Sequence, residues 1–220
     1  MKKIGIIGSG DVAKALAKGF LTNGYDVCMG SRSKEKELSL REEIGKELGE
    51  ELETGTFSDA ARFGELLVLA VKGKAAEEAL HMAGEAQLKG KTIIDVTNPI
   101  DDSRPPENGV LHYFTTLEES LHERLQKKFP QGNFVKAFNS VGNAHMVNPD
   151  FGEITPTMFI CGNSDSAKKE VRFILDQFGW ETADFGKATS ARAIEPLCIL
   201  WCIPGMLQND WNHAFKLLKK

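Results

Sequence analysis

The 220-residue sequence has few cysteines, and none of them form a CxxC pair. The four cysteines, Cys28, Cys161, Cys198 and Cys202, are too scattered to form the disulfide framework of a small secreted domain. Cys198 and Cys202 lie one helical turn apart within an apolar run, a spacing that is typical of core packing. The sequence therefore predicts neither a disulfide-rich fold nor a metal site.

Long hydrophobic runs are also absent. The longest, residues 196–207, has 12 residues and contains two prolines, whereas a membrane-spanning helix needs roughly 20 apolar residues. The first residues, MKKIGIIGSG, have the lysines and apolar residues of a signal peptide, but Gly8 and Gly10 interrupt them and no cleavage-like region follows. We therefore expect a soluble, cytoplasmic protein that does not bind membranes.

Neither sign of charge dominates the sequence. Lys and Arg number 27 against 31 Asp and Glu, the net charge is −4, and no block of like charge forms a basic arm or an acidic tail. This balance argues against nucleic acid as a partner. With 41% hydrophobic residues the chain can build a sizeable core, as expected of a globular protein.

Short apolar runs alternate with segments of helical periodicity along most of the chain. We predict strands at residues 2–7, 25–29, 66–71, 91–96, 134–138, 157–161 and 181–185. We predict helices at residues 11–23, 31–53, 58–63, 74–84, 117–129 and 166–178, the third of these capped by Ser58. Residues from 188 onward have a helical pattern, interrupted at Pro196, Pro204 and Gly205.

This alternation predicts an α/β fold of the Rossmann type, a doubly wound and mostly parallel sheet with helices on both faces. We expect residues 1–186 to form that domain, with residues 187–220 as a small helical segment packed on it. Ligands of such sheets bind beyond the carboxyl ends of the strands. The segments that follow the strands are residues 8–12, 30–33, 71–74, 97–100 and 139–145.

Residues 8–13, GSGDVA, match the GxGxxG/A pattern between a predicted strand and a predicted helix. Gly8 permits the tight turn, Gly10 allows the backbone to approach a pyrophosphate, and Ala13 permits close packing of helix on strand. The helix N-terminus attracts the phosphates. In this position the pattern predicts a dinucleotide-binding turn rather than a merely structural one.

The end of the second predicted strand indicates which dinucleotide binds. NAD-binding domains place an acidic residue there, about 20 residues after the glycines, to bind the ribose hydroxyls. This chain has Ser31, Arg32 and Ser33 instead, with Lys36 nearby. Arg32 can form charge-assisted hydrogen bonds to a 2′-phosphate, which a carboxylate would repel. We therefore predict NADP(H) as the cofactor.

The sequence offers no convincing acid–base pair for catalysis. Lys72, Lys74 and His145 lie at the expected edge of the sheet, but each has an equally good role near the cofactor, in solvent or within a loop. The remaining histidines, at positions 81, 112, 122 and 213, are expected to face solvent. We therefore assign no catalytic residue. This suits a flavin-like acceptor, whose ring accepts a hydride and spreads the charge itself.

Five segments of the chain together resemble a known family. They are GSGDVAKALAKGF, MGSRSKEK, DVTNP, VKAFNSVGNAHMVNP and RAIEPLCILWCIPGML. They are similar to the NADPH-dependent deazaflavin reductases, whose archaeal members are the NADP oxidoreductases of coenzyme F420. The resemblance implies a Rossmann domain, a C-terminal helical segment that helps to form the cleft, a homodimer, and direct hydride transfer between the nicotinamide and a deazaflavin.

The resemblance also implies roles for individual residues. It places Ser9, Gly10, Asp11 and Val12 at the pyrophosphate, Ser31, Arg32 and Lys36 at the 2′-phosphate, and Asn98 and Ala137 near the nicotinamide. The full set that we expect to bind the cofactor adds the neighbouring positions Gly8, Ser33, Val71, Lys72, Pro99 and Asn139.

Two departures from the archaeal pattern leave the hydride acceptor open. This chain has GDVA at residues 10–13 instead of a Gly-Asn-Leu-Gly type of turn, and Phe138 with Asn139 where the archaeal members carry a histidine. It looks more like bacterial relatives and like the nicotinamide domain of the membrane-bound metalloreductases. We expect an enzyme that exchanges hydride between NADP(H) and a flavin or deazaflavin. An imine or carbonyl reductase and an NADP(H) sensor without turnover are the alternatives.

Overall fold

The computed structural model describes residues 2–48 and 52–220, apart from some side chains in the second helix. Within these residues an eight-stranded sheet has the order β3-β2-β1-β4-β5-β6-β7-β8. All neighbouring strands are parallel except β6 and β7, which are antiparallel. The strands are β1 (Lys3–Ile7), β2 (Asp26–Ser31), β3 (Glu53–Thr56), β4 (Leu66–Leu69), β5 (Thr92–Asp95), β6 (Asn133–Lys136), β7 (Thr157–Gly162) and β8 (Glu181–Asp184).

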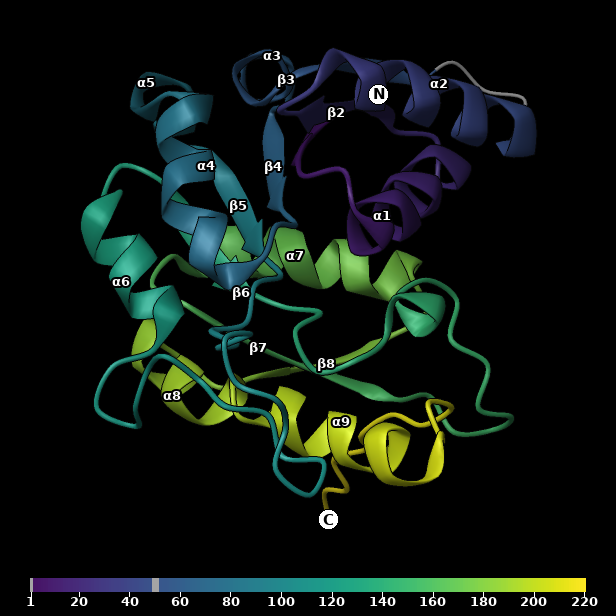
Figure 1. Cartoon of the computed structure of the whole chain (residues 1–220), viewed down its shortest axis with the longest axis vertical. Helices are drawn as coiled ribbons and strands as arrows, with labels where there is room; N and C mark the ends of the chain where they lie inside the picture. Colours follow the sequence, from purple (N-terminus) through teal and green to yellow (C-terminus); the bar gives the residue numbers. More distant parts are fainter. Residues whose placement is uncertain (1, 49–51) are drawn as a thin grey trace.

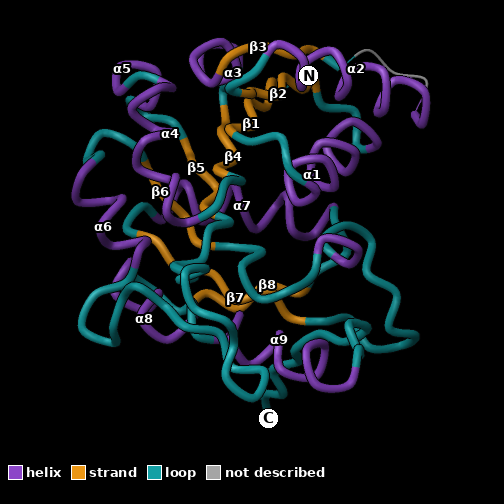
Figure 2. Tube along the Cα trace, in the orientation of Figure 1, coloured by secondary structure: helices purple, strands orange, loops and turns teal. Residues whose placement is uncertain are grey.

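Helices cover both faces of this sheet, as the tube in Figure 2 shows. They are α1 (Asp11–Thr22), α2 (Lys34–Leu48), α3 (Phe57–Phe63), α4 (Ala76–Ala83), α5 (Glu85–Leu88), α6 (Leu121–Lys128), α7 (Asp165–Gln177), α8 (Ala191–Ile194) and α9 (Leu197–Gln208). Short 3-10 turns, η1 (Gly73–Ala75), η2 (Asn143–His145) and η3 (Ala188–Ser190), lie between them. Helices α8 and α9 lie at the end of the molecule away from α2 and β3 (Figure 1).

The core explains why the central strand β4 is apolar throughout. In β4, Leu66 and Val68 pack into one cluster with residues of α1 and α7, whereas Leu67 and Leu69 pack into a second cluster with residues of α4 and α6. Successive side chains of a strand point to opposite faces, so a strand covered on both faces favours hydrophobic residues at successive positions. The predicted doubly wound, mostly parallel α/β fold is confirmed.

Capping residues correct two predicted helix starts. Helix α3 is capped by Thr56, which accepts the N–H of Asp59 in a capping box, so the predicted Ser58 cap is wrong. Helix α6 begins four residues later than predicted, because Ser120 and Glu123 form another capping box. In both cases the cap, rather than the first apolar residue, decides where the helix begins.

The segment between β2 and α3 also differs from the prediction. The sequence predicts one helix over residues 31–53, with apolar residues at helical spacing as far as Leu52. The observed helix, α2, is shorter and ends at Leu48. Residues Glu53–Thr56 instead form β3, which pairs in parallel with β2 at the edge of the sheet. A four-residue edge strand has too few residues to show its own alternation, which is why the sequence pattern did not reveal it.

The C-terminal residues are helical for only part of their length. Helix α9 continues through Pro204 and Gly205 and ends at Gln208, with Asn209 as its C-cap, so the predicted interruptions at Pro204 and Gly205 are wrong. The tail then runs back to β7, where the Thr157 N–H donates to the Phe215 carbonyl at 2.8 Å. Among the described residues one stretch, Ala188–Gln208, is long and apolar enough to cross a membrane by length and composition; this is weak evidence, since core helices pass the same test.

Candidate functional site

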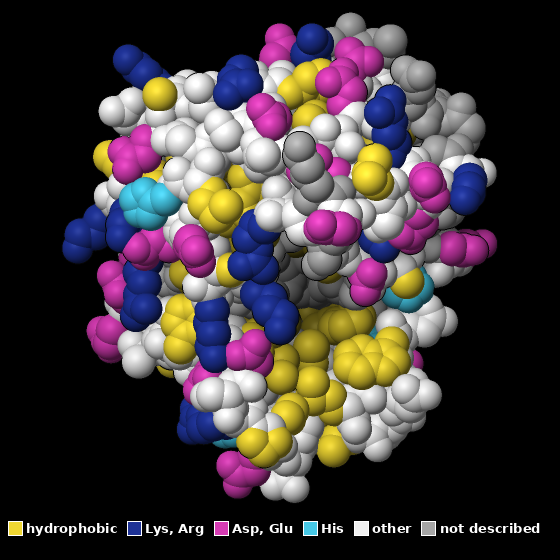
Figure 3. All heavy atoms as spheres, turned by 45° about the horizontal axis from the view of Figure 1, so that its top comes forward, with side chains coloured by type: hydrophobic (Ala, Val, Ile, Leu, Met, Phe, Trp, Pro, Cys, Tyr) yellow, Lys and Arg dark blue, Asp and Glu magenta, His cyan; other side chains and the backbone are white. Residues whose placement is uncertain are grey.

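Two adjoining cavities lie at the carboxyl ends of the central strands. The first cavity, about 570 Å³, is lined by the glycine turn after β1, the end of β2, residues 70–72 after β4, and α4. The second cavity, about 540 Å³, shares Gly10 and residues 70–72 with the first and extends to residues 96–98 after β5. Figure 3 shows a hollow on one face of the molecule, with Lys and Arg side chains at one edge and hydrophobic side chains at another.

The glycine turn leaves the N-terminus of α1 open. Gly8 has a positive φ of 146°, and a Cβ atom there would lie 2.2 Å from the Ala70 carbonyl oxygen, so only glycine fits. Gly10 precedes α1 in an extended conformation without a side-chain cap, and a Cβ atom there would have no atom within 4 Å. The first N–H groups of α1 are therefore available to an anion such as a pyrophosphate.

The end of β2 presents hydroxyl groups and a cation to the first cavity. Ser31 is buried and accepts the Ser33 N–H at 3.2 Å, which shapes the turn, and the Ser33 hydroxyl donates to Glu35. That hydrogen bond lowers the pKa of Glu35, which stays charged. Arg32 is exposed and lines the cavity. The acid that lines this cavity, Glu78, comes from α4 rather than from the end of β2, where an NAD-binding domain places it.

Both apolar and polar side chains line the second cavity. Val12, Val71, Val96 and Ile100 line it together with polar groups such as Asn98. The Asn98 side chain is already engaged: its Nδ2 donates to the Asn139 carbonyl at 2.7 Å, and its Oδ1 accepts from Asn139 Nδ2 at 3.3 Å and lies 3.5 Å from the Tyr113 hydroxyl. Asn98 therefore ties the loops after β5 and β6 together.

Most of the residues expected to bind the cofactor line these cavities. The first cavity contains Gly8, Ser9, Gly10, Ser31, Arg32, Ser33, Val71 and Lys72. The second contains Gly10, Asp11, Val12, Val71, Lys72 and Asn98. Pro99, Ala137 and Asn139 are buried and line neither cavity. Lys36 belongs to α2, and its side chain lies outside the described part of the structure.

The acid–base candidates have other partners. Lys74 pairs with Asp102 at 2.5 Å and with Asp101 at 3.3 Å, and the hydrogen bond to Asp102 raises the pKa of Lys74. Lys72 is exposed and also pairs with Asp102, at 3.3 Å. His145 stacks against a phenylalanine ring with the centroids 5.3 Å apart and lines neither cavity. Lys72 and Lys74 line the second cavity but are both paired with Asp102, whereas His145 lies outside it.

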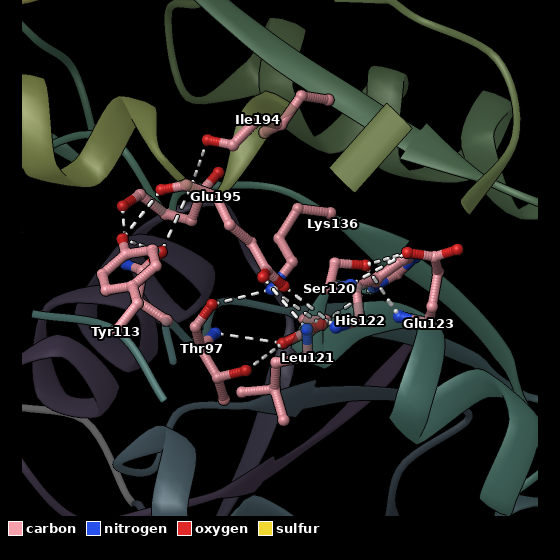
Figure 4. Close-up of polar contacts among 12 residues, drawn as sticks. Thr97, Tyr113, Ser120, Leu121, His122, Glu123, Lys136, Ile194 and Glu195 are labelled. Atoms are coloured by element: carbon pink, nitrogen blue, oxygen red, sulfur yellow. Dashed lines mark hydrogen bonds and ion pairs between the residues drawn. The ribbon is translucent and has the colours of Figure 1, made fainter. Parts of the chain in front are cut away.

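A buried group of charged side chains was missed at the sequence level. His122, which was expected to face solvent, is completely buried, and its Nδ1 lies 2.8 Å from Asp95 Oδ2, so that prediction is wrong. Lys136 is also completely buried, 2.9 Å from Asp95 and 3.2 Å from Glu195 (Figure 4). The sequence hinted at this group only through the charged residues Asp95 and Lys136 within the predicted buried strands TIID and FVKAF.

The charges in this group support one another. Burial by itself would raise the pKa of Asp95, but the Lys136 ammonium and the hydrogen bond from His122 outweigh it and lower that pKa well below its usual range. Burial by itself would lower the pKa of Lys136, but Asp95 and Glu195 together raise it. Asp95 and Lys136 are therefore both ionised near neutral pH.

Comparison with known proteins agrees with this geometry. Residues 3–99 match the model of the family described as coenzyme F420-dependent NADP oxidoreductase. The crystal structure of a proposed F420-dependent NADP reductase from Arthrobacter sp. FB24 has a TM-score of 0.89 and 30% sequence identity, and the match covers 100% of both chains. The chain belongs to the family of coenzyme F420-dependent NADP oxidoreductases. The resemblance inferred from its motifs is confirmed.

Two further proteins are similar to this chain. The F420-dependent NADP reductase of Methanothermobacter marburgensis is 28% identical over 217 residues, which cover 94% of this chain and 95% of that one. The metalloreductase STEAP3 of Rattus norvegicus is 30% identical over 210 residues, 93% of this chain. The chain spans only 39% of that metalloreductase, so the similarity concerns one part of the larger protein.

Proposed function

We propose that this protein binds NADP(H) across the two cavities and exchanges a hydride between the nicotinamide and a flavin or deazaflavin. The observation that carries the proposal is the second cavity, which continues from the open N-terminus of α1 and has Val12, Val71, Val96 and Ile100 in its walls beside paired polar groups. Bound there, the nicotinamide would supply the hydride. The residues of this chain would bind and orient both rings.

The residues that line the first cavity fit the phosphate groups of NADP(H). Arg32 would hold the 2′-phosphate through charge-assisted hydrogen bonds, and Ser33 would join it by exchanging its bond to Glu35 for one to the phosphate. Ser9 and Gly10, with the free N–H groups of α1, would hold the pyrophosphate. Gly10 leaves open the space that a Cβ atom would occupy, as close approach of a phosphate to the backbone requires.

The second cavity suits an acceptor that needs little acid catalysis. Reduction of a carbonyl group requires a proton donor near the oxygen. Lys72 and Lys74 are instead paired with Asp102, and the Asn98 amide is held by Asn139. A flavin-like ring spreads the added charge over its own atoms, so the protein mainly has to hold two rings at the right distance and angle.

The proposal is tested by measuring NADPH oxidation by the purified protein with riboflavin, FMN, FAD and coenzyme F420 in turn, and by repeating each assay with NADH. The proposal expects rapid oxidation of NADPH with one of these ring systems and little with NADH. Turnover of an imine or a carbonyl compound, but of none of the rings, would favour the reductase alternative. Tight binding of NADPH without turnover of any compound would favour a sensor.

We also propose that the protein is a cytoplasmic homodimer. Each chain would divide into a domain of residues 1–186 and a helical segment of residues 187–220. Contacts of α8 with β7 and α6 join that segment to the rest of the chain. Size-exclusion chromatography with light scattering would test the homodimer directly.

A further inference from the structure

The Lys136 ammonium lies at the centre of the buried group of charges shown in Figure 4. Its Nζ atom donates to the Thr97 carbonyl at 2.7 Å and lies 2.9 Å from Asp95 Oδ2 and 3.2 Å from Glu195 Oε1. These three acceptors match the three protons of an ammonium group. We call Lys136, Asp95 and Glu195 the buried clasp.

The buried clasp joins parts of the chain that are far apart in sequence. Asp95 ends β5, Lys136 ends β6, and Glu195 follows α8. The Glu195 carboxylate also accepts the N–H groups of Leu121 and His122 at 3.0 and 2.9 Å, at the start of α6. Lys136 therefore fixes the C-terminal helical segment against the carboxyl ends of two strands, where the proposed site lies.

The clasp acts directly on the wall of the second cavity. Asp95 Oδ1 accepts the Thr97 N–H at 3.0 Å and the Thr97 hydroxyl at 2.7 Å, while Lys136 holds the Thr97 carbonyl. Both backbone polar groups of Thr97 are thus fixed by clasp side chains. Thr97 and the next residue, Asn98, line the second cavity.

A second contact fixes the neighbouring residue from the same side. The Tyr113 hydroxyl donates to the Glu195 carbonyl at 2.8 Å and lies 3.5 Å from Asn98 Oδ1. Asn139, which pairs with Asn98, also donates to the Ile194 carbonyl at 3.0 Å. A displacement of Glu195 would therefore shift Asn98 through two sets of contacts, one with Tyr113 and the other with Asn139.

We propose that Lys136 is a positioning residue, which holds Thr97 and Asn98 in place and so fixes the nicotinamide against the hydride acceptor. This inference rests on the function proposed above. Lys136 lines neither cavity and is completely buried, so it acts through Thr97 rather than by touching a ligand. Three buried charges are a costly way to stabilise a fold, since apolar residues of similar volume stabilise as well or better. A defined geometry at the cavity wall accounts for them.

The chain offers a matched control in Lys168. This lysine is also nearly buried, and it pairs with Asp184 at 2.9 Å and donates to the Gly186 carbonyl at 3.3 Å. Its contacts join α7 to the end of β8, and none of these residues lines the second cavity. Loss of Lys168 should affect stability alone, whereas loss of Lys136 should affect hydride transfer as well.

The test compares Lys136→Met, Glu195→Gln and Lys168→Met with the unchanged protein. For each, the dissociation constant of NADPH, kcat with the best acceptor of the panel above, and the unfolding temperature are measured. Glu195→Gln keeps the shape of the side chain and leaves Lys136 paired with Asp95, so it provides a variant expected to fold if Lys136→Met does not.

We expect Lys136→Met to lower kcat by about 10- to 100-fold, because ring misplacement of an ångström has effects of that size. Glu195→Gln should lower kcat in the same direction but by less, and in both variants the dissociation constant of NADPH should stay within about threefold. Lys168→Met should lower the unfolding temperature and leave kcat unchanged. Folded variants of Lys136 or Glu195 with the kcat of the unchanged protein, or an equal loss of kcat in Lys168→Met, would overturn the proposal.

A readout without turnover separates this inference from the proposed function. The fluorescence anisotropy of bound NADPH reports how firmly the nicotinamide is held, and it can be measured without any acceptor. We expect lower anisotropy in Lys136→Met or Glu195→Gln than in Lys168→Met at saturating protein. Equal values in all variants would contradict the positioning role, even if no flavin or deazaflavin accepts a hydride. Failure of the acceptor panel with a clear loss of anisotropy would contradict only the proposed function.

Discussion

Gly8 lies against the backbone of Ala70, where a Cβ atom would be 2.2 Å from the carbonyl oxygen. The turn between β1 and α1 thus packs on the end of β4, and the two cavities share residues 70–72 directly beside it. Gly10, two residues later, has open space where its Cβ atom would be. Gly8 is therefore required by the packing of the fold, whereas Gly10 keeps space open for a ligand.

Alanine substitutions at Gly8 and Gly10 should therefore have different effects, the first on stability and the second on NADPH binding. Gly10→Ala should keep or slightly raise the stability of the free protein, by up to about 1 kcal/mol, because its φ of −87° suits alanine. It should weaken NADPH about tenfold or more, since at least one charge-assisted hydrogen bond is lost. Gly8→Ala should lower the unfolding temperature. Calorimetric binding and thermal unfolding check both, and normal NADPH binding by Gly10→Ala would contradict the placement of the pyrophosphate.

Arg32 should determine the preference for NADPH over NADH. Removal of the guanidinium in Arg32→Ala should cost about 1.5–3 kcal/mol of NADPH binding, or about 10- to 100-fold, through the lost bonds to the 2′-phosphate. NADH lacks that phosphate, so its affinity should change by no more than about threefold. Arg172→Ala, on the exposed surface of α7, is the control. Equal losses for the two dinucleotides would mean that Arg32 does not bind the 2′-phosphate.

The buried clasp predicts how stability depends on pH. The folded pKa of Asp95 is lowered, so its contribution is complete above the unfolded value of about 3.9 and is lost as the pH falls below it. The folded pKa of Lys136 is raised, so its contribution is complete below about pH 10.4 and is lost as the pH rises through the higher folded value. The clasp contributes fully between these limits.

Asp95→Asn tests this pH dependence. At neutral pH the substitution should destabilise the protein by about 3–5 kcal/mol, because it removes one partner of a buried ion pair. The difference from the unchanged protein should shrink as the pH falls below about 4, because Asp95 of the unfolded chain takes up a proton there while Asp95 of the folded protein is still ionised. Urea unfolding across this range measures it, with the exposed Asp176→Asn as control. A difference that does not change with pH would show that Asp95 is not ionised in the folded state.

The thiols should differ in reactivity. Burial raises the pKa of both the Cys28 and the Cys161 thiols to about 12, so neither forms a thiolate at neutral pH. Cys202 is only partly buried, and its hydrogen bond with Cys198 lowers its pKa. Iodoacetamide at about pH 8 should therefore modify Cys202 first and leave Cys28 and Cys161 intact until the chain unfolds. Mass spectrometry of the folded protein reads this out, and early labelling of Cys161 would refute it.

Local signals in the sequence were sufficient for most of the fold. The apolar runs of β1 and β4 and the glycine turn after β1 each depend on neighbouring residues alone, and the sequence predicted all of them. The edge strand β3 was missed because four residues carry too little pattern, and the tail after α9 because its position depends on a contact with β7. Tertiary contact, rather than local preference, decided both segments.

The residues of the candidate site were likewise predicted where they depend on local sequence and missed where they depend on tertiary contact. Arg32 and Gly10 lie within two short segments, so their positions followed from strand ends. The buried clasp was not predicted, because Asp95, Lys136 and Glu195 come from three elements that meet only after folding. His122 lies on a helix as predicted, but it is buried rather than exposed to solvent. Its pairing with Asp95 cannot be inferred from the sequence of the helix alone.

Direct transfer of hydride from NADPH to the acceptor ring is the central claim, and rapid-mixing spectroscopy without oxygen tests it most directly. The protein, NADPH and the acceptor that performs best in the panel are mixed, and the absorbances of both rings are followed together. Direct transfer requires that NADPH oxidation and ring reduction proceed at one rate, and that deuterium at the reactive nicotinamide carbon slow both. Tight binding of NADPH with neither absorbance change, for every flavin and deazaflavin offered, would contradict it.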